Sequence, residues 1–136
     1  MTMKFEFTDG RTIDVEGIYG SPQLIHGSMR DTLQIEINPN NINFNSLKAL
    51  FSEPNNLETI YSICIHQEDE LSDPIETRTE IGAGYTILVS ITDEYRQIYP
   101  VPGTWNQPKT EELYIVVISQ ETYAEHQLRL LNSNKE

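Results

Sequence analysis

The alternation of apolar and polar residues in the first fifteen positions is compatible with only one β-hairpin. A two-residue turn at Asp9-Gly10 would place Phe5 opposite an aspartate and mix apolar and charged side chains on both faces. A three-residue loop, Thr8-Asp9-Gly10, places Phe5 opposite Ile13 and gathers the apolar side chains on one face. This loop also sets Gly10 at the left-handed position of a bulged turn, where glycine is least strained. We therefore predict a hairpin with a three-residue loop.

Five further segments have strand patterns. Leu33, Ile35 and Ile37 alternate with polar residues, which is typical of a strand with one buried face. The run from Leu113 to Ser119 is largely apolar on both faces and predicts a central strand. The predicted segments are residues 31–37, 57–66, 75–81, 85–92 and 113–119. With the hairpin they make seven strands.

Glycine and proline predict the breaks between these strands. Residues 17–27 read as a turn-rich stretch, with Gly20-Ser21-Pro22 as its strongest breaker. Gly82-Ala83-Gly84 reads as the three-residue loop of a second hairpin between residues 75–81 and 85–92. That loop would put one set of odd-numbered side chains on a shared face. The set is Ile75, Ile81, Tyr85, Ile87, Val89 and Ile91.

Two helices are expected. A polar, asparagine-rich turn over residues 38–43 precedes a short helix over residues 45–52, and Pro54 ends it. The apolar face of this helix comprises Phe44, Leu47, Leu50 and Phe51. A second helix, residues 120–131, is expected to begin at a Ser119 cap and to dock an apolar stripe on its own sheet. The stripe comprises Tyr123, Leu128 and Leu131. Glu125 and Arg129 have the spacing of a helix-stabilising ion pair.

The predicted fold class is mainly β (α+β): a small antiparallel barrel or sandwich with one short internal helix and a C-terminal helix. The strands come as adjacent hairpins rather than as strand–helix–strand units, which favours antiparallel pairing. Residues 1–131 are expected to form one β-rich domain, and residues 132–136 a loose C-terminal tail.

Charge excludes several classes of function. The net charge is −12, and residues 49–77 contain seven acidic side chains with no lysine or arginine. Such a surface repels nucleic acids and anionic membranes, so we expect neither as a partner. The loop over residues 67–74 provides a candidate acidic surface: Glu68, Asp69, Glu70 and Asp73. Its spacing does not match a calcium-binding loop, so we predict a solvated loop rather than a metal site.

No catalytic, cofactor-binding or metal-binding residue is predicted, and we expect the protein not to be an enzyme. The histidines are scattered without zinc-ligand spacing. Cys64 and His66 would share a strand face, but Cys64 lies between two isoleucines and reads as a buried small hydrophobe. A single cysteine allows no internal disulfide, and no apolar run reaches membrane-spanning length, so we expect a protein made in a cytoplasm.

Aromatic residues supply the candidate contacts for a partner protein. Trp105 lies in a proline-bracketed loop that begins at Tyr99, and an aromatic side chain on a stiffened loop is a common interface anchor. The alternative is that Trp105 folds back onto the core. Tyr123 on the second helix completes the candidate set: Tyr99, Trp105 and Tyr123.

Four patterns together resemble a family. They are Phe5-x-Phe7-x-Asp9-Gly10, the strand over residues 30–37, Leu47-x-x-Leu50-Phe51, and the glutamine-, tyrosine- and leucine-containing helix over residues 120–131. In these features the chain resembles small uncharacterised proteins encoded in the tail and late-gene modules of phages and prophages of Gram-positive bacteria. The resemblance implies a non-enzymatic role in virion assembly or host interaction, with incorporation in a virion, and it implies no active site.

Three functions follow as hypotheses. The first is a protein–protein interaction or structural protein, such as a phage or prophage tail component, which contacts another protein or forms a homo-oligomer. The second is an acidic inhibitor that mimics nucleic acid and binds a basic protein. The third is a small-ligand-binding domain whose site the sequence does not reveal.

Overall fold

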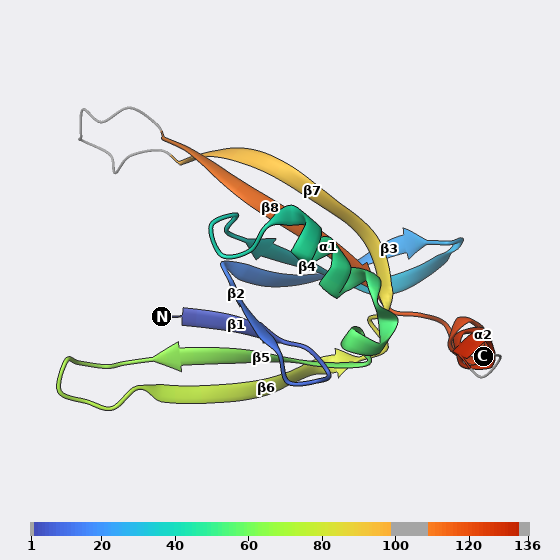
Figure 1. The fold of residues 1–136 in the computed structure, drawn as a ribbon, viewed down its shortest axis with the longest axis horizontal. Coiled ribbons are helices and arrows are strands. Elements are labelled where there is room, and N and C mark those ends of the chain that lie inside the picture. The colour runs from blue at the N-terminus through green and yellow to red at the C-terminus, as the bar shows by residue number, and fades with distance from the viewer. Residues whose placement is uncertain (1, 99–108, 134–136) are drawn as a thin grey trace.

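Alternating strands assemble into two four-stranded antiparallel sheets in the computed structural model, which describes residues 2–98 and 109–133. The first sheet has the order β2-β1-β5-β6, and the second has the order β3-β4-β8-β7 (Figure 1). The strands are β1 (Thr2–Glu6), β2 (Thr12–Val15), β3 (Gly17–Ile25), β4 (Ser28–Ile37), β5 (Thr59–His66), β6 (Ile75–Ala83), β7 (Ile87–Ile98) and β8 (Lys109–Ser119). The helices are α1 (Phe44–Ser52), a 3-10 helix η1 (Pro54–Leu57) and α2 (Tyr123–Ser133). The fold is mainly β, as predicted, and it is not a closed barrel.

The predicted register of the first hairpin is confirmed. Phe5 pairs with Ile13 and Met3 pairs with Val15. The amide of Phe7 donates to the carbonyl of Arg11 at 2.8 Å, which leaves three residues in the loop. Gly10 has a φ of 92°, the left-handed conformation that the loop requires.

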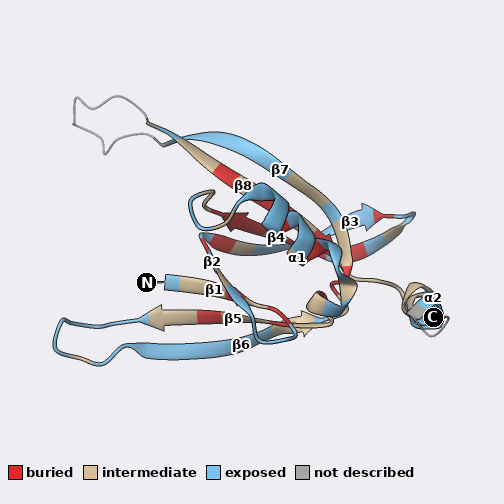
Figure 2. Ribbon diagram, viewed as in Figure 1, coloured by how far each residue is buried: buried red, intermediate tan, exposed pale blue. Residues whose placement is uncertain are grey.

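The core lies between the two sheets and under α1 (Figure 2). From the second sheet it receives Leu33, Ile35 and Ile37, the predicted inward face of β4. Asn43 caps α1 by accepting a hydrogen bond from the amide of Ser46 at 2.8 Å, and the helix buries Leu47 and Phe51. Three aromatic rings meet there, with centroids 5.0 to 5.5 Å apart: Phe5, Phe7 and Phe51.

β8 is a central strand, as its apolar sequence predicts. It lies between β4 and β7, and Val116 and Ile118 are fully buried against the inward face of β4. The expected strand over residues 57–66 begins two residues later, at Thr59, because Leu57 is the last residue of η1.

The expectation of a turn-rich stretch over residues 17–27 is wrong. These residues form β3, in which Pro22 pairs with Asp31 of β4, and they add an eighth strand. β3 is an edge strand, and an edge strand tolerates proline because one side of its backbone has no neighbour to which it must donate. The turn lies instead at His26-Gly27, where both residues have positive φ.

The predicted second hairpin is also wrong. β6 pairs with β5 in the first sheet, whereas β7 pairs with β8 in the second, so the chain crosses between the sheets around Gly84. The ring of Tyr85 lies so close to Gly82 that a β-carbon there would be 2.9 Å from it. The expected shared face is therefore divided: Tyr85 is buried, while Ile75 and Val89 are exposed.

A second crossing joins the sheets on the opposite side. β2 and β3 are separated only by Glu16, whose amide donates to the carbonyl of Glu36 in β4 at 2.7 Å. The two sheets are thus joined directly from strand to strand at two corners, and the connection from β4 to β5 runs through α1 and η1. The helix α2 follows β8 and lies at the end of the molecule near the Gly84 corner (Figure 1). The amide of Glu121, just before the helix, donates to the carbonyl of Gly84.

The His26-Gly27 turn gives a test of the hairpin geometry. Gly27→Ala should lower the free energy of unfolding by about 1 kcal/mol, because alanine is strained at a φ of 83°. Gly20→Ala is the matched control: its φ is not positive and its new β-carbon would lie 3.8 Å from Leu33, so stability should stay equal or rise by about 0.5 kcal/mol. Denaturant unfolding of the two variants measures both values. Equal destabilisation by both would contradict the assigned turn.

Candidate interaction surface

The start of α2 is fixed by a reciprocal pair of hydrogen bonds. The amide of Thr122 donates to Glu125 Oε1 at 2.8 Å, and the amide of Glu125 donates to Thr122 Oγ1 at 3.2 Å. This capping box satisfies amides that a helix start otherwise leaves unpaired. Ser119 is not the cap, as we had expected, because it is the last residue of β8. The helix continues to Ser133 and so includes two residues expected in the tail.

Glu125 also ties α2 to the β3–β4 hairpin. Its Oε1 accepts a short hydrogen bond from Nη1 of Arg30, which is almost fully buried, and its Oε2 lies 3.2 Å from His26 Nδ1. Arg30 Nε further donates to Ser28 Oγ at 2.9 Å. A carboxylate on the helix is thus held by a strand residue and by the turn that precedes this strand.

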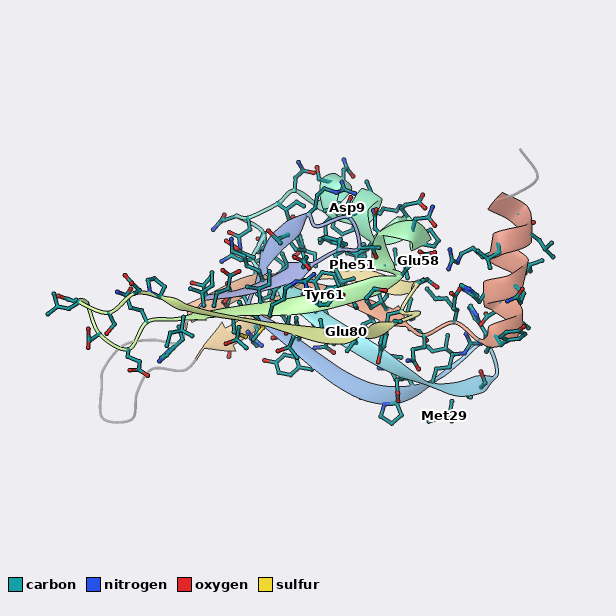
Figure 3. All side chains as sticks on the ribbon, turned by 90° about the horizontal axis from the view of Figure 1, so that it is seen from below. Asp9, Met29, Phe51, Glu58, Tyr61 and Glu80 are labelled. Atoms are coloured by element: carbon teal, nitrogen blue, oxygen red, sulfur yellow. The ribbon has the colours of Figure 1, made fainter. Side chains whose placement is uncertain are left out.

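Arg129 makes a second ionic connection, one helical turn further on. Its guanidinium binds both carboxylate oxygens of Glu121 at 3.0 and 3.2 Å, and it also reaches Glu58 Oε1 at 3.0 Å. His126 Nδ1 lies 2.7 Å from Glu121. Glu58 precedes β5, so this cluster joins α2 to the first sheet (Figure 3).

The apolar stripe of α2 is exposed to solvent and is not buried against the sandwich. Tyr123 is 80% exposed, and Leu128 and Leu131 are each 59% exposed. None of the helix residues whose burial is described is buried (Figure 2). The expectation that this stripe docks on its own sheet is therefore wrong. The ionic face of the helix docks instead.

The hydrogen bonds at both connections favour ionised carboxylates. The backbone hydrogen bond from Thr122 is the main cause that lowers the pKa of Glu125 to about 2; burial opposes it, and His26 and Arg30 add to it. Burial would raise the pKa of Glu121, but hydrogen bonds with Arg129 and His126 outweigh it and hold that pKa below its usual value.

The other predicted contact residues fall in two groups, those outside the described residues and those in the acidic loop. Tyr99 and Trp105 lie outside the described residues. The acidic loop between β5 and β6 lies at the far end of the molecule from α2 (Figure 1). Within this loop the exposed Asp69 accepts hydrogen bonds from Ser72 and Leu71 that lower its pKa. The other three acidic residues are exposed as well: Glu68, Glu70 and Asp73.

The cysteine and the histidine that share a face of β5 are not buried. Cys64 is half-buried in β5, paired with Met3 and Thr77, and His66 is exposed two residues further on. Among residues 2–98 and 109–133, no group of three or more acidic, histidine or cysteine side chains is arranged to hold a metal ion. No helix in the same part of the chain is long and apolar enough to cross a membrane.

Sequence reasoning missed the partners of α2. His26 and Arg30 belong to the β3–β4 hairpin and Glu58 precedes β5, so no local pattern connects them with the helix. The capping box did have a signal, because Thr122 and Glu125 have the Thr-x-x-Glu spacing. The prediction of Ser119 as the cap did not take this spacing into account.

Comparisons with models of protein families, with curated proteins and with solved structures found no match for this chain.

Acid should release α2 before it unfolds the sandwich. The pKa of Glu125 is about 2 in the folded protein against a usual 4.5, so its stabilising contribution is complete above pH 4.5 and is lost as the pH falls towards 2. Glu121 contributes in the same direction. Amide hydrogen exchange should therefore show loss of protection in α2 over this range, ahead of β4 and β8.

Glu125→Gln keeps an acceptor for the capping box, but it should loosen α2 already at neutral pH, with a local loss of about 1.5–3 kcal/mol from the lost ion pair with the buried Arg30. Glu70→Gln in the exposed loop is the matched control and should leave the protection of α2 unchanged. Protection of α2 that is identical in the two variants would contradict the role of Glu125.

Proposed function

We propose that the protein acts without catalysis, by contact with another protein chain through the exposed stripe of α2. One observation carries the proposal: an amphipathic helix is bound to its own domain by its charged face and presents its apolar face outward. A helix that merely completes the fold would bury that face. Exposed apolar side chains gathered on one helix are typical of helix-in-groove recognition.

The ion pairs supply the rigidity that such a contact needs. Because Glu125 and Arg129 each bind a group on the body of the protein, the helix keeps one orientation before it meets a partner. A pre-oriented helix loses less conformational freedom on binding, and the affinity rises accordingly. Tyr123, the predicted contact residue in the described part of the chain, lies on the outward stripe.

A role in a phage or prophage tail is the narrower form of this proposal. Its support is the resemblance in sequence patterns, together with a surface suited to assembly. In that case the partner of α2 would be another protein of the virion.

A second candidate function, mimicry of nucleic acid, has support from the β5–β6 hairpin. Within the described residues, Glu68, Glu70 and Asp73 have no ion-pair partner, whereas all five arginines are paired with carboxylates inside the molecule. Binding to a basic protein through this hairpin would weaken steeply with salt, whereas apolar contact through α2 would not. The salt dependence of complex formation therefore separates the two functions.

Photo-cross-linking in the producing cell tests the proposed function. A photoreactive amino acid in place of Ala124, within the stripe, should give discrete protein adducts, and the same residue in place of the exposed Glu80 on β6 should give several-fold less. Adding Leu128→Glu should remove the Ala124 adducts, because a charge in the stripe would have to be desolvated. Equal adducts from the two positions would contradict a docking role for α2.

A further inference from the structure

The outward stripe of α2 has a composition that suits one kind of occupant. Tyr123, Gln127 and Leu131 follow each other at spacing four, and Ala124 and Leu128 lie beside them. All five side chains are exposed and none carries a charge. On a chain of net charge −12, this is a place where two identical molecules can meet without opposing carboxylates at the centre of contact.

The middle of the stripe is self-complementary. Gln127 carries both a hydrogen-bond donor and an acceptor on its amide. Across a two-fold axis through this position, the amide of one copy can donate to the amide oxygen of the other and accept in return. A single polar residue inside an apolar helix seam fixes register in this way, because any shifted pairing leaves it without a partner.

The ends of the stripe fit the same arrangement. Antiparallel helices related by that axis bring Tyr123 of one copy to the Leu131 end of the other. Ala124 gives the bulkier Leu128 room to approach across the seam. The dipoles of the two helices then oppose each other, which favours antiparallel over parallel pairing.

We infer that α2 is a self-association element, which pairs with α2 of a second copy of this chain in an antiparallel, two-fold arrangement centred on Gln127. The inference rests on the proposed function, since it names the partner of the same stripe. A contact along a single eleven-residue helix is smaller than the interface of a stable dimer. The dimer is therefore weak, and it dissociates on dilution with a Kd on the order of 10 µM or higher.

Light scattering after size exclusion tests the pairing. Across about a hundredfold range of concentration, the wild-type mass should rise from that of one chain, 15.6 kDa, towards twice that value. High salt should not weaken association and should favour it, because salt screens the repulsion between two acidic bodies. Leu128→Glu should hold the protein at the mass of one chain, with an unchanged circular dichroism spectrum and melting temperature, since Leu128 is exposed.

An engineered disulfide at position 127 tests where the two-fold axis between the two helices lies. In a Cys64→Ser background, Gln127→Cys should form a disulfide-linked dimer rapidly under mild oxidation, because the two thiols face each other across the axis. Glu70→Cys, in the exposed loop at the far end of the molecule, should form it several-fold more slowly. Adding Leu128→Glu should slow the Gln127→Cys reaction to the rate of that control.

The outcomes separate the inference from the function on which it rests. A monomer at every concentration, with Gln127→Cys no faster than Glu70→Cys, overturns self-pairing. If the Ala124 position still cross-links to a different protein in the producing cell, the proposed function stands with another partner. If it gives no adduct either, both are overturned. A dimer that survives Leu128→Glu places the contact elsewhere and also overturns the inference.

Discussion

The contact among Phe5, Phe7 and Phe51 is the constraint on which the rest of the structure depends. Two of these rings come from the first hairpin and the third from α1, so the cluster joins the first sheet to the helix. All three side chains are fully buried, and aromatic pairs at such distances stabilise beyond the burial of their area. The position of α1 against this hairpin in turn sets where η1 and Glu58 lie.

Glu58 connects this core to α2, because its carboxylate accepts a hydrogen bond from Arg129 of the helix. No apolar side chain of the helix is buried among the residues whose burial is described, so its orientation follows from fixed charges on the sandwich: Arg30 on β4 and Glu58 before β5. Partly exposed ion pairs hold a helix less firmly than apolar burial does, but they define its direction through hydrogen-bond geometry. The molecule thus has a rigid core and, apart from it, an exposed apolar stripe on α2, whose orientation is set by ion pairs with the sandwich.

Local patterns predicted much of the fold and little of the candidate surface. The first hairpin was predictable in full, because only one register puts Phe5 and Ile13 on the same face. β3 was missed because Pro22 signals a break unless the strand is known to lie at an edge, and edge position depends on the whole sheet. The stripe on α2 was recognised, but its direction depends on Arg30 and Glu58, which are distant in sequence, and no single-helix pattern contains that information.

The second sheet cannot form in full until β8 has been synthesised. β8 is the last strand in chain order, yet it lies between β4 and β7, and Leu33 of β4 pairs with Ile118. While the chain is being synthesised, the β3–β4 hairpin therefore emerges long before the strand that completes its sheet. Its row of Leu33, Ile35 and Ile37 stays without its β8 neighbours throughout that interval. A row of apolar side chains without its strand neighbours favours aggregation during that interval.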